Sequence, residues 1–210
     1  MASDRDALAA RLHSYHAVAF GVESCPHTAE MRRAWGKALG PPSSSPRIVY
    51  IGCDASPKEE ELCRSAGIQT TPTLAFGGVQ FPGYVPLPRV RELLDLADAV
   101  GDGLVRRDAV CYVRPGCVWS LRQRTTLGPI ASKVAFVDCS VESARCAAAG
   151  VQAVPAWQVG GAAAPVVHGF QPIPGLQALV NADESELRSQ AATSSAALRG
   201  AARGGASERL

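Results

Sequence analysis

Apolar and polar positions follow one another along this chain in short blocks that alternate between two spacings. Leu8 and Leu12 lie four positions apart, which is the spacing of one face of a helix. Runs rich in Val, Ile, Tyr and Phe, such as residues 47–53, are typical of buried strands. The first half is predicted to hold helices at 4–14, 26–39, 58–66 and 88–99, and strands at 17–22, 47–53, 73–76 and 79–83.

The second half of the chain repeats the first half at matched positions. The matched segments are Cys25-Pro26-His27-Thr28 with Cys117-Val118-Trp119-Ser120, 48–53 with 134–139, 63–69 with 146–152, and 83–88 with 169–174. Such self-similarity predicts two copies of one folding unit. Each copy has the order strand, helix, strand, helix, hairpin and helix, which indicates an α/β class with a parallel βαβ unit and an antiparallel hairpin.

The predicted boundaries follow from these repeats and from shifts in composition. A first domain covers residues 1–100, a linker 101–108, a second domain 109–183 and a tail 184–210. The linker region is rich in Gly and Asp, and the Pro- and Ser-rich stretch 41–46 is predicted to be a surface loop. The tail is rich in Ala, Ser, Gly and Arg, so we expect it to be weakly helical or flexible.

Composition excludes several classes of function. The chain of 210 residues has room for two domains of roughly 100 residues each. A net charge of +2 with scattered basic residues gives no basis for nucleic-acid binding. The sequence has no stretch of about 20 apolar residues, so it predicts no membrane span. No targeting peptide is visible in this numbering, because a helical pattern begins at the start of the chain.

Several short motifs together resemble one known family. Cys25-Pro26-His27, a downstream pair of cysteines, Gly67-Ile68 before Pro72-Thr73, and Gly77-Gly78 before Gly83-Tyr84 are similar to the thioredoxin-like domain fused to vitamin K epoxide reductase homologues of bacteria and chloroplasts. The resemblance covers nearly the full length of each repeat and is closer in the first. It implies two tandem thioredoxin-like domains, each with a central mixed sheet flanked by helices. The family's four-helix membrane domain has no counterpart here.

The cysteine turns depart from the family in one respect. A cysteine at a helix N-terminus is stabilised as the thiolate by the helix dipole and by free backbone N–H groups. The resemblance implies that Cys25 and Cys117 are the candidate catalytic residues, with His27 favouring the thiolate. Thr28 and Ser120 stand where the family has its second, resolving cysteine. Because a mixed disulfide must be released by a second thiol, neither half is expected to turn over as a dithiol enzyme.

Three hypotheses for Cys25 and Cys117 remain open. They are monothiol exchange released by an external thiol, loss of redox use in a binding or structural module, and a bond between the two cysteines. The leading expectation is a non-catalytic accessory or scaffold protein that binds other proteins, as in a membrane complex with a lumenal face. A monothiol oxidoreductase or isomerase using Cys25 is the alternative, so whether the protein is an enzyme stays open. No cofactor is expected.

The remaining cysteines lie downstream of these turns. The resemblance implies the pairs Cys53–Cys63 and Cys139–Cys146, which we expect to be structural disulfides worth about 2.5–3 kcal/mol each. Free thiols or a redox sensor are the alternatives. Their spacing suits no metal site. Such bridges would place the protein in an oxidising compartment, either the periplasm or the thylakoid lumen. The unmatched Cys111 lies in a strand-like run and is expected to be a small buried hydrophobe.

Two proline loops complete the predicted site. Thr71-Pro72 and Val154-Pro155 stand where thioredoxin-like folds carry a cis-proline that faces the cysteine. The resemblance implies that this loop offers backbone groups to an extended peptide. A docking role could survive the loss of the redox chemistry. The alternative is that both prolines only shape the turn.

Overall fold

The computed structural model describes residues 4–40 and 47–204. Within it the chain divides into two compact units, residues 1–98 with 126–129, and residues 99–125 with 130–210. The predicted loop at 41–46 and the last six residues of the predicted tail lie outside the described residues.

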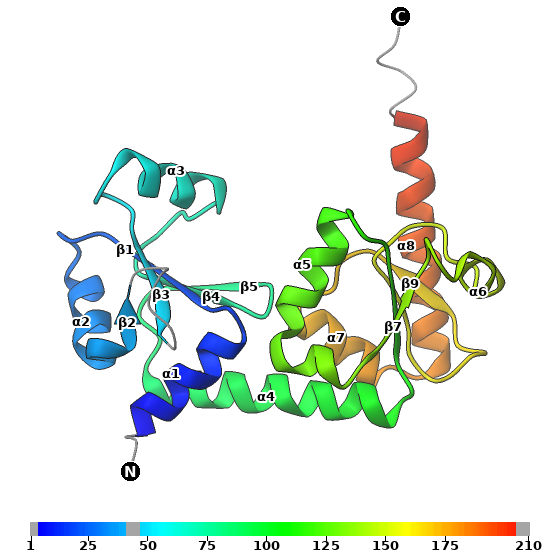
Figure 1. Cartoon of the computed structure of the whole chain (residues 1–210), viewed down its shortest axis with the longest axis horizontal. Helices are drawn as coiled ribbons and strands as arrows, with labels where there is room; N and C mark the ends of the chain where they lie inside the picture. Colours follow the sequence, from blue (N-terminus) through cyan, green and yellow to red (C-terminus); the bar gives the residue numbers. More distant parts are fainter. Residues whose placement is uncertain (1–3, 41–46, 205–210) are drawn as a thin grey trace, which may run out of the picture. The chain divides into compact units, whose positions relative to one another are not determined.

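The first unit is built on a five-stranded mixed sheet with the order β2-β3-β1-β4-β5 (Figure 1). β1 runs parallel to β3 and antiparallel to β4, which pairs with β5 in a hairpin. The two-residue edge strand β2 was not predicted, because two residues are too few to show an alternating pattern. The strands are β1 (Val18–Gly21), β2 (Leu39–Gly40), β3 (Ile48–Gly52), β4 (Thr73–Phe76) and β5 (Val79–Pro82).

Helices of the first unit form where the apolar spacing predicted them. Leu8 and Leu12 of α1 are both buried. The predicted helix 26–39 ends as an α-helix at Trp35, because Gly36 adopts a left-handed φ of +51° and a short 3₁₀ turn follows. The elements are α1 (Asp4–Ser14), α2 (Pro26–Trp35), η1 (Gly36–Ala38), α3 (Pro57–Ser65) and the start of α4 (Leu87–Arg106).

The second unit has a four-stranded mixed sheet with the order β7-β6-β8-β9. β6 pairs parallel with β7 and antiparallel with β8, which pairs with β9. Trp157 and Leu176 are fully buried in its core. The elements are β6 (Val110–Val113), α5 (Val118–Leu127), η2 (Gly128–Ser132), β7 (Ala135–Asp138), α6 (Ser143–Ala148), β8 (Ala156–Gln158), β9 (Val166–His168), α7 (Ile173–Asn181) and α8 (Glu184–Gly204). The fold class is therefore the predicted α/β class, with two mixed sheets flanked by helices.

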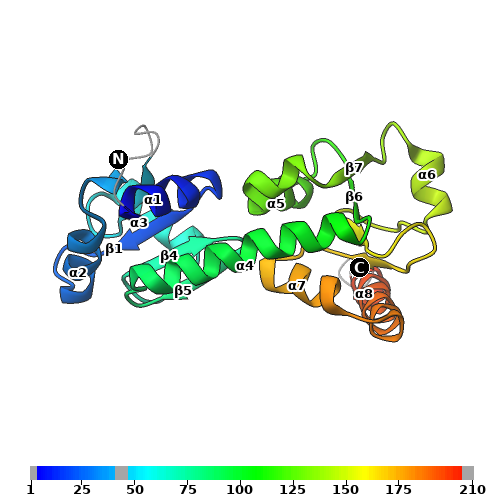
Figure 2. The same ribbon diagram turned by 90° about the horizontal axis from the view of Figure 1, so that it is seen from below.

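The end of α4 corrects one prediction. The helix was expected to stop at Ala99 and to be followed by a linker, but it continues to Arg106. Gly101 and Gly103 do not break it, because they are sites of close packing: a Cβ there would lie 2.8 Å from Ile130 and 2.4 Å from Val180. Figure 2 shows α7, which carries Val180, beside the C-terminal half of α4. The division between the two units falls within this helix.

Most of the predicted tail forms the helix α8. A reciprocal capping box starts it: the Asp183 carboxylate accepts a hydrogen bond from Glu186 N–H, and Glu186 accepts one from Asp183 N–H, both at 2.9 Å. Leu187 is buried, and Ser194 Oγ accepts a hydrogen bond from the backbone N–H of His168 in β9. The part of α8 from Glu184 to Ser194 thus packs on the second unit. No helix among the described residues is long and apolar enough to cross a membrane.

Candidate functional site

The first candidate site is the turn between β1 and α2. Cys25 directly precedes α2, and Pro26 occupies the first turn of that helix. The Thr71–Pro72 peptide bond is cis, and Cys25 Sγ lies 3.4 Å from the carbonyl oxygen of Thr71. The structure thus brings together a cysteine and a proline loop that lie far apart in the sequence. His27 is exposed on the first turn of α2.

Cys25 is partly exposed, and its surroundings favour the thiolate. Hydrogen bonds from the backbone N–H and the hydroxyl of Thr28 lower the pKa of the Cys25 thiol to about 7, and the backbone and side chain of His27 add smaller contributions. Cys25 is therefore substantially ionised at neutral pH. Ionisation makes the sulfur a nucleophile and does not supply a second sulfur.

Thr28, three positions after Cys25, is a structural residue of this turn. Its side chain is only 1% exposed. Its Oγ1 accepts a hydrogen bond from the backbone N–H of Val22, just after β1, at 3.3 Å. The hydroxyl thus fixes the turn before Cys25 and also supports the thiolate.

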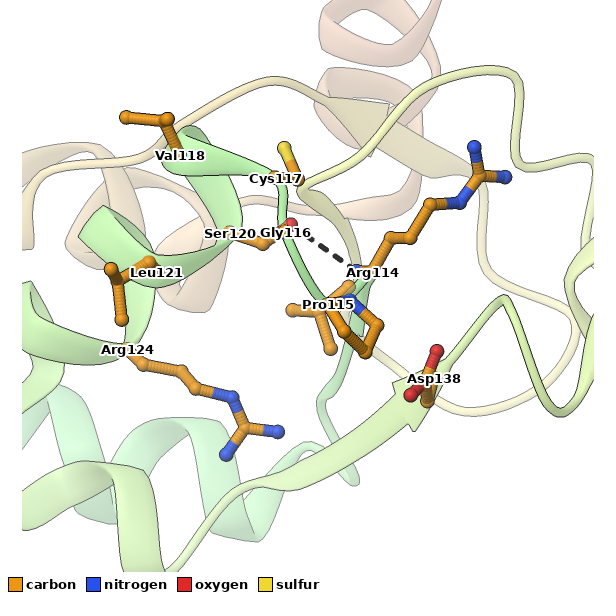
Figure 3. A pocket seen from close by; sticks show the side chains of 10 residues that line it. Arg114, Pro115, Gly116, Cys117, Val118, Ser120, Leu121, Arg124 and Asp138 are labelled. Carbon is orange, nitrogen blue, oxygen red and sulfur yellow. Dashed lines mark hydrogen bonds between the residues drawn. The ribbon is translucent and has the colours of Figure 1, made fainter.

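The second unit reproduces this arrangement at Cys117. Cys117 directly precedes α5, its Sγ lies 3.7 Å from the carbonyl oxygen of Val154, and the Val154–Pro155 bond is cis. Ser120 is buried, and its Oγ accepts a hydrogen bond from the Arg114 N–H at 3.3 Å, drawn as the dashed line in Figure 3. A hydrogen bond from the Ser120 hydroxyl is the largest cause that lowers the pKa of Cys117. Both units therefore hold one thiol, one buried hydroxyl and one cis-proline loop.

A cavity of about 370 Å³ lies beside Cys117 in the second unit (Figure 3). Large apolar side chains near this turn are exposed, Val118 by 75% and Leu121 by 67%. Neither this cavity nor Arg124 was predicted from the sequence. One signal was available: an arginine stands seven positions after the motif cysteine in both repeats. The residues that line the cavity are Val113, Arg114, Pro115, Gly116, Cys117, Val118, Ser120, Leu121, Arg124 and Asp138.

Both expected disulfides are formed, Cys53–Cys63 and Cys139–Cys146. Three of these four cysteines are buried, and each bridge packs with the apolar residues of a core cluster. Burial in the core favours a structural role over redox sensing, because a sensor must be reached by its oxidant or reductant.

Three cysteines remain as free thiols, Cys25, Cys111 and Cys117. Cys111 is fully buried in β6, and burial raises the pKa of its thiol well above the ordinary range. It is the small buried hydrophobe that was predicted. Across residues 4–40 and 47–204, no three His, Cys, Asp or Glu side chains are grouped so that they could hold a metal ion.

Comparisons with known proteins find similarity only among solved structures. No family model matches the chain, and no curated protein matches it. A domain of the alkylhydroperoxide reductase AhpF from Enterococcus faecalis is 17% identical, with a TM-score of 0.32 over 83% of this chain and 97% of that one. A protein disulfide oxidoreductase from Aeropyrum pernix is 15% identical, with a TM-score of 0.33 over 87% and 94%. Full-length ERdj5 is 18% identical, with a TM-score of 0.34 over 68% and 24%. Similarities this weak indicate no activity.

Proposed function

We propose that this protein is a non-catalytic, protein-binding member of the thioredoxin-like class, and that its two cis-proline loops dock extended segments of partner proteins. The observation that carries the proposal is the pair of buried hydroxyls at Thr28 and Ser120. They replace the resolving sulfur in both units, while the loop carbonyl oxygens of Thr71 and Val154 still lie 3.4 Å and 3.7 Å from the cysteine sulfurs.

The chemistry of exchange explains why the hydroxyls matter. A thiolate at Cys25 that attacks a partner disulfide forms one mixed disulfide and expels one partner thiolate. Release then requires a second thiolate to attack one of the two sulfurs of this mixed disulfide. The Thr28 hydroxyl is not ionised at neutral pH, and it is already hydrogen-bonded to Val22. The first unit alone therefore stops at the mixed disulfide, and the same argument holds for Cys117 and Ser120.

The two disulfides bear on the compartment in which the protein would work. Two bridges buried within the cores are compatible with an oxidising, extracytoplasmic space such as the periplasm or a thylakoid lumen. In this proposal the protein is an accessory subunit, and its partner is a membrane complex that it binds on the lumenal face.

Capture of partners from the native source tests the docking role. Tagged protein and its Cys25→Ala variant should enrich the same partner, because docking does not need the sulfur. Thr71→Arg and Val154→Arg should reduce that partner by tenfold or more, since the added side chain would cover the loop carbonyls. Ser189→Arg adds the same charge on the exposed face of α8 and should have no effect. Equal enrichment by all variants would refute docking at these loops.

A monothiol exchange enzyme is the second candidate, and the low pKa of Cys25 favours it. In that mechanism an external thiol such as glutathione releases the mixed disulfide. Insulin reduction assayed with glutathione distinguishes the two functions. If the protein is non-catalytic, we expect the rate of insulin reduction with the unmodified protein and with Cys25→Ser to equal the uncatalysed rate. Turnover that depends on Cys25 would establish the enzyme instead.

A further inference from the structure

The two units share an arginine that the redox chemistry does not use. Arg32 in α2 and Arg124 in α5 each stand seven positions after the motif cysteine. Each guanidinium lies over an aromatic ring of the neighbouring strand, Arg32 over Tyr50 at 5.5 Å and Arg124 over Phe136 at 3.9 Å from the ring centroid. The repeats therefore provide an internal comparison of one cationic group in two settings.

In the first unit a carboxylate of the chain itself neutralises this cation. Glu23, in the turn before Cys25, accepts a hydrogen bond from Arg32. The backbone N–H of Glu23 donates to the Asp54 carboxylate, at 3.0 Å to the nearer oxygen, which holds the turn in place. The guanidinium of Arg32 is thus stacked on one side and paired at its edge.

In the second unit the corresponding carboxylate is missing. Pro115 stands where the first repeat has Glu23. Within the described ranges 4–40 and 47–204, no carboxylate forms an ion pair with Arg124. The 370 Å³ cavity lies at this place, with Pro115 and Arg124 in its lining (Figure 3). Because the face of the guanidinium is against Phe136, its N–H groups lie at the edge, where they suit a carboxylate.

The other charges of the cavity leave it cationic. Asp138 lines it too, but one of its oxygens already accepts hydrogen bonds from Ser140, from the N–H at 2.8 Å and from the hydroxyl at 2.6 Å. Arg114 is also a lining residue, so the lining has two arginines and one aspartate. Exposed Leu121 and Val118 form an apolar rim beside these charges.

We propose that the cavity beside Cys117 binds an acidic side chain of an extended protein segment, in the place that Glu23 fills in the first unit. The carboxylate pairs with the edge of Arg124, and an apolar side chain next to it in the segment packs on Leu121 and Val118. Charge complementarity and the apolar rim together select an acidic, amphipathic segment. The inference rests on the proposed function, because it names the partner chemistry of one of the two docking sites.

Fluorescence anisotropy with two labelled peptides tests the site. The probes are fluorescein-Gly-Ser-Val-Leu-Glu-Gly-Ser and its counterpart with Gln in place of Glu. The acidic peptide should bind about tenfold more tightly, as expected for one charge-assisted pair. Arg124→Gln should remove this preference. Pro115→Glu should remove it as well, because it restores the carboxylate of the first repeat without touching the arginine.

The matched control is Arg32→Gln in the first unit, which should leave the preference unchanged. Equal affinity for the two peptides, a preference that survives Arg124→Gln, or no binding of either peptide would overturn the inference. The proposed function is tested separately from this inference. If both peptides bind equally well and Val154→Arg abolishes the binding of both, docking at the proline loop holds and only the acidic preference is wrong.

Discussion

The hydroxyl of Thr28 accepts a hydrogen bond from the backbone N–H of Val22 at 3.3 Å, so the hydroxyl three positions after Cys25 is buried and has a hydrogen-bond partner. Ser120 and Arg114 repeat this relationship in the second unit. In each unit, a buried hydroxyl accepts the same backbone hydrogen bond. This hydroxyl therefore has a structural use that does not depend on redox chemistry. A sulfur in place of this hydroxyl is the smallest change that would give the turn a second thiol.

Thr28→Cys is expected to create dithiol turnover. The new sulfur would stand three positions after Cys25, at the start of the same helix, where a resolving thiolate can attack the mixed disulfide. We expect insulin reduction with dithiothreitol to rise at least tenfold above that of the unmodified protein. Thr28→Ser keeps the hydroxyl and should show no gain. A Thr28→Cys variant that forms the internal disulfide but stays inactive would contradict this expectation.

The reactivity of Cys25 is expected to follow its lowered pKa. The thiolate is present above the pKa, so the rate of alkylation by iodoacetamide should rise with pH and reach half of its maximum near pH 7. Thr28→Val removes the hydroxyl that stabilises the thiolate, and it should move this midpoint upward. Measuring the rate from pH 5 to 10 in a Cys117→Ser background isolates Cys25. A midpoint that does not move in Thr28→Val would contradict the assigned cause.

Removal of either core disulfide is expected to destabilise its own unit. Replacing Cys53 and Cys63 together by Ala should lower the free energy of unfolding by about 2.5–3 kcal/mol on the loop-entropy estimate. Replacing Cys139 and Cys146 should cost about 2.5 kcal/mol, because that loop is shorter. Urea unfolding followed by circular dichroism measures both. Cys117→Ala is the control, since it removes a free, partly exposed thiol. No change on removing the bridges would mean that they do not constrain the unfolded chain.

Much of the fold could be predicted because it depends on local patterns and on the repeat. The bounds of α1 and β4 match their predicted ranges, since the apolar spacing and the flanking turn residues agree there. Pairing each repeat with the other also located the cysteine turns and both proline loops. What local patterns predicted least well were features that depend on packing between distant segments. The glycines of α4 suggested a linker, and only the side chains packed against them explain the continuous helix.

The candidate site also has features that the sequence predicted and features that it did not. Cys25 and Cys117 could be identified from their motifs, but the cavity beside Cys117 could not, because it depends on a missing side chain. Pro115 leaves open a place that Glu23 fills in the other repeat, and sequence alone does not show whether neighbouring residues close such a gap. The stacking of Arg124 on Phe136 likewise joins two elements that the sequence leaves apart.

Gly103→Ala tests whether α4 is a packed helix and not a linker. In an exposed helix this substitution stabilises by about 1 kcal/mol, because glycine is a poor helix former. Here the new Cβ would lie 2.4 Å from Val180, so we expect a net loss of about 1–3 kcal/mol from overpacking. Val180→Ala should recover part of that loss in the double variant. Gly200→Ala in α8 is the matched control, because nothing lies within 4 Å of its Cβ position, and it should stabilise. If Gly103→Ala stabilised the protein as well, the contact with Val180 would not constrain α4, and this part of α4 would behave as an exposed helix.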